Sequence, residues 1–347
     1  MNKYLDNFYD WWKNIDKFLL SLILGLFLLG LFFSLVSTSL IASDKLDTKS
    51  YYFFFKHSAY IGLAIVILIF FSFLNQKFLT KLSFILFLVA FLSLLLVPFL
   101  GIEVKGSKRW LDLVFLPRFQ PVEIVKPFLI VSLSLMLTIQ NRKLYFKYFL
   151  SSLFILPILM LLIYQPDIGQ TLLISMVWLA LIFVSGINIF IFFIFFLFVG
   201  STVSYLILFV PKFEYIKIRL FAFLDSSSGN NYQAEKASDA IINGGFFGKG
   251  IGEGTLNSRV PEAHTDYIIS VISEEFGAII VIGILFLYLI FSYRVIRKVN
   301  FLNEDLYKLI LTGCVFLILS QTFIHVGVNI RILPTTGMTL PFLSYGG

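Results

Sequence analysis

The residues best suited to chemistry stand just before a long apolar run. Glu262, His264, Thr265 and Asp266 fall within five residues, and the apolar run continues from there to about residue 293. A carboxylate at the mouth of a membrane helix can act as a general base on a hydroxyl group. Aspartate at such a position can equally cap the helix. Both roles stay open for Asp266.

A glycine-rich run precedes these residues, with six glycines among the eleven residues 244–254. Lys249 lies inside the run and Arg259 follows it. Glycine lets the backbone approach a ligand closely, so the run can bring N–H groups to an anion. The same composition is typical of a flexible loop, which is the plainer interpretation.

A second polar group lies in segment 106–126, where Lys108 and Arg109 precede Trp110. Lysine and arginine bind phosphate through charge-assisted hydrogen bonds. We expect the neighbouring indole ring to pack against a sugar. The cations therefore suit contacts with phosphate, and the indole suits contact with the face of a sugar.

The same segment then opens a helix, because proline is tolerated in a first turn, where its missing N–H has no partner. Gln120 and Pro121 mark this start, and Glu123 and Lys126 follow at a spacing of three. Residues three apart share a helix face, so an ion pair at the helix end is one interpretation. A role in binding is the other, because Lys126 lies within the apolar span.

Two further polar features interrupt apolar segments. Asp167 lies in a short turn and is placed to cap the next helix. Gln321, His325 and Asn329 recur every four residues and therefore share a helix face. A polar stripe inside a membrane helix faces protein or water rather than lipid. The spacing of these residues does not indicate a zinc site.

The elements that must position these groups are membrane helices. Of the 347 residues, 59% are hydrophobic and 14% are charged, against roughly 25% charged in soluble domains. A soluble protein of this length could not bury so much apolar surface, so the predicted fold class is an all-α polytopic membrane protein. About nine spans of roughly 20 residues are expected, at residues 18–43, 53–74, 82–100, 122–140, 146–163, 169–186, 188–210, 266–293 and 306–330.

The other segments complete a single membrane domain over residues 1–347. Residues 1–17 form an interfacial N-terminus, in which Trp11 and Trp12 suit the headgroup zone. Residues 211–265 form a large loop between the seventh and eighth spans. We expect a tenth span to begin near Leu340 and interpret the chain as cut before that helix ends. The single cysteine, Cys314, excludes a disulfide framework.

The numbers of lysines and arginines in the loops on the two sides do not decide the orientation by themselves. The long loop 211–265 is weak evidence, because long segments translocate with little regard to charge, and the short loops favour a cytoplasmic N-terminus. On that orientation, basic residues gather on the outer face, where the orientation rule does not explain them. An anionic ligand handled there would explain them. The chain has no Walker motif, so ATP-driven transport is not expected, and nothing indicates binding of nucleic acid.

Taken in order, these segments resemble the signatures of the SEDS family of shape, elongation, division and sporulation proteins, which includes FtsW, RodA and SpoVE. The matching stretches are GSKRWLDL with FQPVEIVKP, YQPDIGQTL, NGGFFGKGIGEGT with PEAHTDYIISVISEEFG, and LPTTGMTLPFLSYGG. They cover most of the chain. GEGT followed by PEAHTD resembles the FtsW branch, with RodA as the near alternative. One departure is Val122, where the family commonly has serine.

The resemblance implies ten membrane helices with both termini in the cytoplasm, in the inner membrane of a bacterium. It also implies a peptidoglycan glycosyltransferase that polymerises lipid II into glycan strands at the outer face of the membrane during septal wall synthesis. The family's essential aspartate falls at Asp266, which would act as general base on the acceptor hydroxyl while a lipid pyrophosphate leaves. A divalent cation, Mg²⁺ or Mn²⁺, would assist the leaving group, although the sequence contains no metal motif.

The candidate substrate-binding residues are Lys108, Arg109, Trp110, Gln120, Glu123, Lys126, Asp167, Lys249, Arg259, Glu262, His264 and Thr265. The expected partners are lipid II, a class B penicillin-binding protein transpeptidase, other divisome proteins and the bilayer, with no nucleic acid.

Three alternatives are kept. The first is a RodA-like elongation polymerase. The second is a lipid II flippase, for which only Glu274, Glu275 and His325 offer ionisable groups at depth. The third is a scaffold that recruits a transpeptidase and has no activity of its own.

Overall fold

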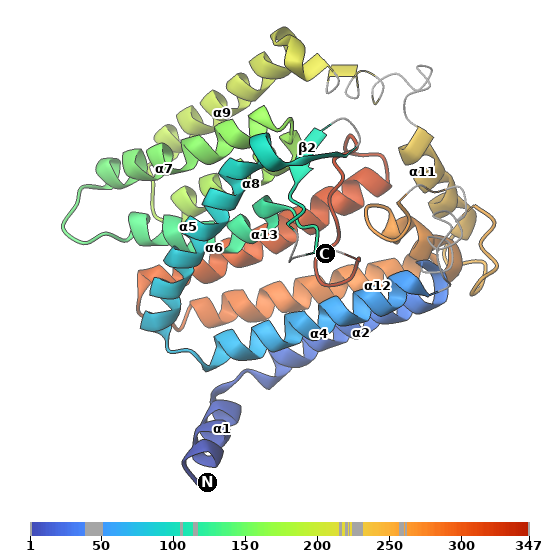
Figure 1. Cartoon of the computed structure of the whole chain (residues 1–347), viewed down its shortest axis with the longest axis horizontal. Coiled ribbons are helices and arrows are strands. Elements are labelled where there is room, and N and C mark those ends of the chain that lie inside the picture. Colours follow the sequence, from blue (N-terminus) through green and yellow to red (C-terminus); the bar gives the residue numbers. More distant parts are fainter. Residues whose placement is uncertain are drawn as a thin grey trace. The chain divides into compact units, whose positions relative to one another are not determined.

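Helices predominate in the described part of the chain in a computed structural model (Figure 1). The structure describes residues 2–38, 51–104, 107–113, 117–214, 217–218, 221, 223, 232–256, 260 and 262–345. The elements in chain order are α1 (Asn2–Asn14), α2 (Lys17–Phe33), the π-helical η1 (Ser34–Thr38), α4 (Tyr52–Phe73), α5 (Gln76–Leu100), β1 (Ile102–Val104), β2 (Ser107–Trp110), α6 (Pro121–Leu137), α7 (Leu144–Tyr164), α8 (Ile168–Val184), α9 (Ile189–Phe209), the 3₁₀ turn η2 (Pro211–Phe213), α11 (Tyr232–Gly244), α12 (Ile268–Val299) and α13 (Asp305–Asn329). The predicted all-α class is confirmed, with one short antiparallel hairpin, β1–β2, in the described part of the chain.

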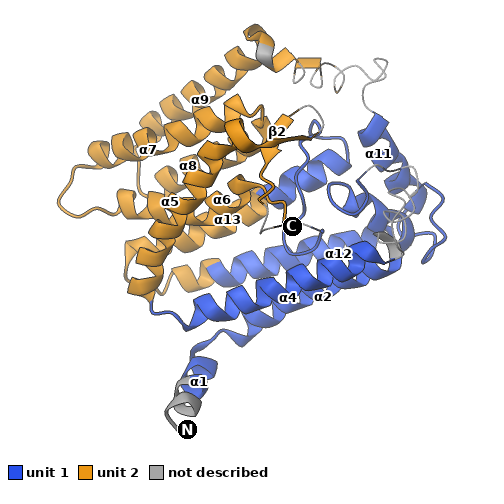
Figure 2. Cartoon of the chain, viewed as in Figure 1, with its two compact units in different colours: residues 1–75, 226–295, 321–347 blue, residues 76–225, 296–320 orange. Residues whose placement is uncertain are grey.

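Two compact units make up the chain (Figure 2). Unit 1 comprises residues 1–75, 226–295 and 321–347, and unit 2 comprises residues 76–225 and 296–320. Unit 1 therefore contains α2, α4, α11 and most of α12, whereas unit 2 contains α5 to α9. The single membrane domain expected over residues 1–347 stays a prediction.

Helices lie at all nine predicted spans, although not all are of membrane-crossing length, and residues 39–43 of the first span lie outside the described residues. Among the described residues, seven helices are long and apolar enough to cross a bilayer: α2 with its π-helical extension, α4, α5, α7, α9, α12 and α13. The other two, α6 and α8, have 17 residues each. A bilayer core of about 30 Å needs roughly 20 helical residues. The protein is thus a multi-pass membrane protein whose exact number of crossings stays a prediction.

Short polar side chains begin several of these helices. Asp16 accepts hydrogen bonds from the backbone N–H of Phe18 and Leu19 at the start of α2, at 3.1 Å each. Asn188 accepts one from Phe190 N–H at 2.9 Å at the start of α9. The first N–H groups of a helix have no partner inside it, so a side-chain oxygen in this position stabilises the helix end.

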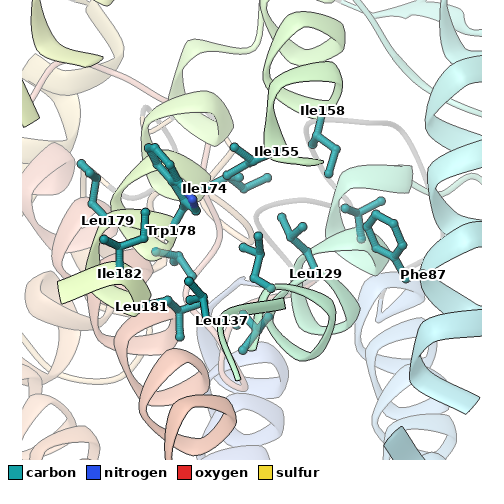
Figure 3. Close-up of a cluster of buried hydrophobic side chains, with 14 of the residues drawn as sticks. Phe87, Leu129, Leu137, Ile155, Ile158, Ile174, Trp178, Leu179, Leu181 and Ile182 are labelled. Carbon is teal, nitrogen blue, oxygen red and sulfur yellow. The ribbon is translucent and has the colours of Figure 1, made fainter. Parts of the chain in front are cut away.

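A continuous apolar core joins α5, α6, α7 and α8 in unit 2 (Figure 3). Phe87, Leu129, Ile155 and Trp178 each come from a different one of these helices, and all four are almost completely buried. Trp178 Nε1 donates a hydrogen bond to Ser151 Oγ at 3.3 Å, which satisfies the buried indole. This core fixes the ends of α6 and α8, where the polar groups of unit 2 lie.

The eighth predicted span is not one continuous helix, which corrects the expectation for residues 266–293. α12 is interrupted at Gly277, whose φ of 84° and ψ of 167° are open only to glycine. The run after α11 packs against this break: Gly245 O and Phe246 O accept hydrogen bonds from Ala278 N–H and Ile279 N–H, at 3.0 and 3.3 Å. The interruption therefore leaves these backbone groups satisfied.

The glycines after α11 allow this contact, and so the described part of the run is not a flexible loop. A Cβ atom on Gly244, Gly248 or Gly277 would overlap backbone atoms of the opposing segment. Lys249 N–H and Gly250 N–H donate to the carbonyls of Glu274 and Glu275, at 2.9 and 3.0 Å. These two donors hold the chain together and are not available to an anion.

Candidate active site

A connected polar network in unit 2 contains most of the candidate residues of segment 106–126, together with Asp167. Arg109 Nε lies 3.6 Å from Asp167 Oδ2, and Gln120 Nε2 donates to the same oxygen at 3.3 Å. Arg109 also donates to the backbone carbonyl of Pro166. Three separate segments, the end of β2, the start of α6 and the start of α8, are thereby joined around one carboxylate.

The network continues along α6. Gln170 Nε2 donates to Glu123 Oε1 at 2.6 Å, and Lys126 Nζ lies 2.6 Å from Glu123 Oε2. The predicted pairing of Glu123 and Lys126 on one helix face is confirmed. The Lys126 side chain is only 4% exposed, while that of Glu123 is 36% exposed. A buried ammonium at this depth is anchored by its carboxylate partner.

Asp167 both accepts the contacts of Arg109 and Gln120 and caps α8. Its Oδ1 accepts a hydrogen bond from Gln170 N–H at 3.3 Å, which confirms the predicted helix cap. Burial raises the pKa of the Asp167 carboxyl above its ordinary value, and the nearby Arg109 guanidinium acts in the opposite direction.

Not every candidate of unit 2 belongs to this network. Lys108 and Trp110 lie on β2 and are exposed, and their role in binding stays a prediction. Gln170 was not among the predicted site residues, although it bridges Asp167 and Glu123. Its position three residues after a helix-capping aspartate was the available signal.

In unit 1, Asp266 lies in a turn that leads into α12, and the helix itself begins at Ile268. Glu262, with a φ of 52°, makes the turn tight. The carbonyl of Glu262 accepts hydrogen bonds from the N–H groups of Thr265 and Tyr267, at 3.0 and 3.3 Å. Thr265 Oγ1 also donates to Glu262 Oε2 at 3.3 Å. Glu262 and Thr265 thus shape the backbone that presents Asp266.

Asn329 of α13 holds this turn from the other side. Its Nδ2 donates to the carbonyls of Asp266 and His325, at 3.0 and 2.8 Å. Its Oδ1 accepts from Ser270 Oγ at 2.7 Å and from Ser270 N–H at 3.3 Å. The amide is fully buried and uses all its donors and acceptors. The backbone of Asp266 is therefore fixed relative to α13.

The rest of the predicted polar stripe on α13 holds the segment that follows it. His325 Nδ1 is 2.7 Å from the carbonyl of Met338, and Gln321 Nε2 donates to the carbonyl of Thr339 at 3.0 Å. This brings Gly337 next to Asp266, where a Cβ atom would stand 3.5 Å from Asp266 Oδ2. The stripe thus faces protein, as expected.

An aromatic cluster completes the surroundings of the turn. The ring of His264 lies 4.7 Å from Phe53 and 5.7 Å from Tyr345, and the carbonyl of His264 accepts a hydrogen bond from Tyr345 N–H at 3.2 Å. Lys56 places its ammonium over the Tyr345 ring, 5.9 Å from its centre. Lys56 was not predicted, because a single lysine at the end of an apolar span gives no distinctive pattern.

The remaining basic candidates have separate outcomes. The Lys249 side chain is exposed in unit 1, and Arg259 lies outside the described residues. No three His, Cys, Asp or Glu side chains in the described ranges are arranged to hold a metal ion. The expected assistance by Mg²⁺ or Mn²⁺ therefore stays a prediction.

Similar proteins of known name share almost the whole chain. The chain is 32% identical to the probable peptidoglycan glycosyltransferase FtsW of Caulobacter vibrioides, over 97% of this chain and 86% of that protein. It is 34% identical to the protein of the same name in Coxiella burnetii, over 96% and 91% of the two chains.

Solved structures share the fold. A structure described as "Structural coordination of polymerization and crosslinking by a peptidoglycan synthase complex" matches with a TM-score of 0.74 and 25% identity, over 96% of this chain and 92% of that one. The rod shape determining protein RodA of Thermus thermophilus matches with a TM-score of 0.68 and 25% identity, over 96% and 91%. The FtsW/RodA/SpoVE model, described as cell cycle protein, matches residues 17–347, and the chain therefore belongs to this family.

Proposed function

We propose that this protein is a peptidoglycan glycosyltransferase that polymerises lipid II, with Asp266 as its general base. The observation that carries the proposal is the fixed placement of Asp266: Asn329 holds its backbone, and Gly337 adds no side chain beside its carboxylate. The named relatives support the reaction class, since they are described as probable peptidoglycan glycosyltransferases.

The reaction balances with groups on this chain and its substrates. The 4-hydroxyl of the acceptor sugar attacks the anomeric carbon of the donor, forming a C–O bond, and its proton passes to the Asp266 carboxylate. The bond from that carbon to the polyprenyl pyrophosphate breaks, and the pyrophosphate leaves with the electron pair. Cations stabilise this departing charge, and Lys249 and Arg259, the basic candidates of unit 1, are the proposed sources.

We propose a division-specific role and a transpeptidase partner on the same basis. The relatives cited above carry the name FtsW, and one similar structure is of a complex described as coordinating polymerisation and crosslinking. Location at the septum, further division proteins as partners, and assistance by a divalent cation belong to this proposal.

The flippase alternative loses support from the contacts of its candidate residues. Glu274 Oε1 accepts hydrogen bonds from Asn243 Nδ2 and Leu256 N–H, both at 2.8 Å, and so ties the glycine-rich run to α12. His325 is bonded to the Met338 carbonyl. Groups that are committed to the fold in this way are poorly suited to carry a substrate through alternating states.

The test is polymerisation of lipid II by the full-length protein with its cognate transpeptidase, comparing Asp266→Asn with the unchanged protein. General-base catalysis contributes roughly 10²–10⁴-fold, so the variant should lose at least about 100-fold in rate. Asp305→Asn is the matched control, because Asp305 is an exposed acid paired only locally with Lys308. Equal polymer from both variants, with complex formation intact, would remove Asp266 from the mechanism.

A further inference from the structure

The end of α11 and the run that follows it, residues 242–251, form a tip that is hydrogen-bonded to α12. Its carbonyls at Gly245 and Phe246 are bonded to Ala278 and Ile279, the first residues after the break in the helix. The glycine contacts described above bring the backbones of this tip and α12 so close that no Cβ fits between them.

The break in α12 stands directly before a long apolar stretch of that helix. Beyond Gly277 the helix is apolar until Arg294, Arg297 and Lys298 near its other end. Roughly 26 Å of helix separates Gly277 from Arg294, which is close to the thickness of a bilayer core. Phe276 also contacts Phe33, the last residue of α2, with ring centres 5.2 Å apart. The break in α12 therefore lies beside the end of α2.

The tip presents large apolar side chains beside this break. Phe246 is 71% exposed and Phe247 is 85% exposed, with Ile242 and Ile251 also exposed beside them. The exposed Ile279 of α12 continues the same apolar surface, and its N–H is bonded to the carbonyl of Phe246. An apolar patch that is continuous with the lipid-facing side of a membrane helix, at the end of its apolar stretch, is placed to enter lipid.

We propose that Phe246 and Phe247 insert into the bilayer leaflet on the side of Asp266, and so anchor the segment that supports α12 at its break. A protein partner is the other class of occupant for an exposed apolar patch. The patch continues the lipid-facing surface of α12, and hydrogen bonds join the tip to that helix. Both observations favour lipid as the occupant. The anchor would set the depth of the Asp266 turn relative to the membrane surface, where a lipid-linked substrate has to react.

Because the chain has a single cysteine, Cys314, its replacement leaves a background in which one introduced cysteine can be labelled at a time. In a Cys314→Ser background, nitroxide spin labels are attached after Phe247→Cys, Phe246→Cys, Ile282→Cys or Glu253→Cys, and the full-length protein is placed in phosphatidylglycerol and phosphatidylethanolamine vesicles. Power saturation then compares collisions with oxygen, which concentrates in lipid, and with a water-soluble nickel chelate. Ile282 is the lipid-facing reference on α12, and Glu253 is the exposed reference on the polar side of the same loop.

Labels at residues 246 and 247 should give oxygen-to-nickel ratios close to that at residue 282 and several-fold above that at residue 253. Ratios equal to that at residue 253 at both positions would overturn the proposal. Water-exposed labels that lose nickel access only when the transpeptidase is added would also overturn it, and would assign the patch to a protein interface. Neither reading depends on the catalytic role of Asp266.

Discussion

The polar groups of the two units are held in different ways. In unit 2, charged side chains hold one another, as Arg109 does with Asp167 and Lys126 with Glu123. In unit 1, the neutral amide of Asn329 holds the backbone of Asp266. A buried charge that loses its partner costs several kcal/mol, whereas a lost neutral hydrogen bond costs about 1–3 kcal/mol. Changes in unit 2 should therefore act first on stability, and changes at Asn329 first on activity.

The largest effect on stability is expected at a backbone contact of unit 1, and it should exceed the effects of the side-chain changes described below. Gly277→Ala should lower the free energy of unfolding by about 3 kcal/mol or more, because the backbone angles exclude a side chain and a Cβ would overlap Phe246 and Gly248. Unfolding in denaturing detergent measures it. Gly283→Ala is the control in the same helix, since nothing lies within 4 Å of its Cβ position. A similar small change in both variants would show that the break is not required.

The next effect tests unit 1 directly. Asn329→Ala should lower kcat roughly 100-fold with a small change in KM, because a displacement of about 1 Å at a catalytic group has that consequence. Polymerisation rates at varied lipid II concentration provide the measurement. Ser292→Ala is the control, because Ser292 is buried but bonds only within its own helix, to the Tyr288 carbonyl. Loss of stability with unchanged kcat in the folded fraction would place Asn329 among purely structural residues.

A smaller effect is expected in unit 2. Lys126→Met should destabilise the protein by about 2 kcal/mol, less than for a fully buried pair because Glu123 is partly exposed. Replacing both partners, with Lys126→Met and Glu123→Gln, should restore much of that loss, since the second change removes the charge left without its partner. Detergent unfolding of the two single variants and the double variant forms the cycle. Strictly additive losses would mean that the pair is not coupled.

The smallest effect is a pH dependence in unit 2. Because the pKa of Asp167 is raised by burial, the folded protein holds this proton more tightly than the unfolded chain does. Stability should therefore fall as pH rises from the ordinary value of 3.8 through the higher folded pKa, and stay at the lower level above it. Arg109→Gln should extend this fall to higher pH, because it removes the cation that opposes the shift.

Unfolding measured as the pH rises from 3.8 tests the assignment to Asp167. Asp167→Asn should remove the fall, and Asp305→Asn, at an exposed acid, should leave it unchanged. A fall that persists in Asp167→Asn would have to come from another group.

Local patterns in the sequence determined the membrane class, the positions of the helices and several contacts of short range. The apolar spans predicted the helices, the spacing of Glu123 and Lys126 predicted their ion pair, and Asp167 capped the helix that follows it. These features depend on hydrophobicity and on neighbours within one helical turn, which the order of residues fixes directly.

Only the tertiary structure decided which distant residues meet. The break at Gly277 depends on the run after α11 supplying its hydrogen-bond partners, so composition alone presented an uninterrupted apolar helix. Asn329 reaches the carbonyl of Asp266 across 63 residues, and Arg109 reaches Pro166 across 57. No periodicity encodes such pairs, because they follow from how the helices pack, and packing depends on the shapes of all the side chains between them.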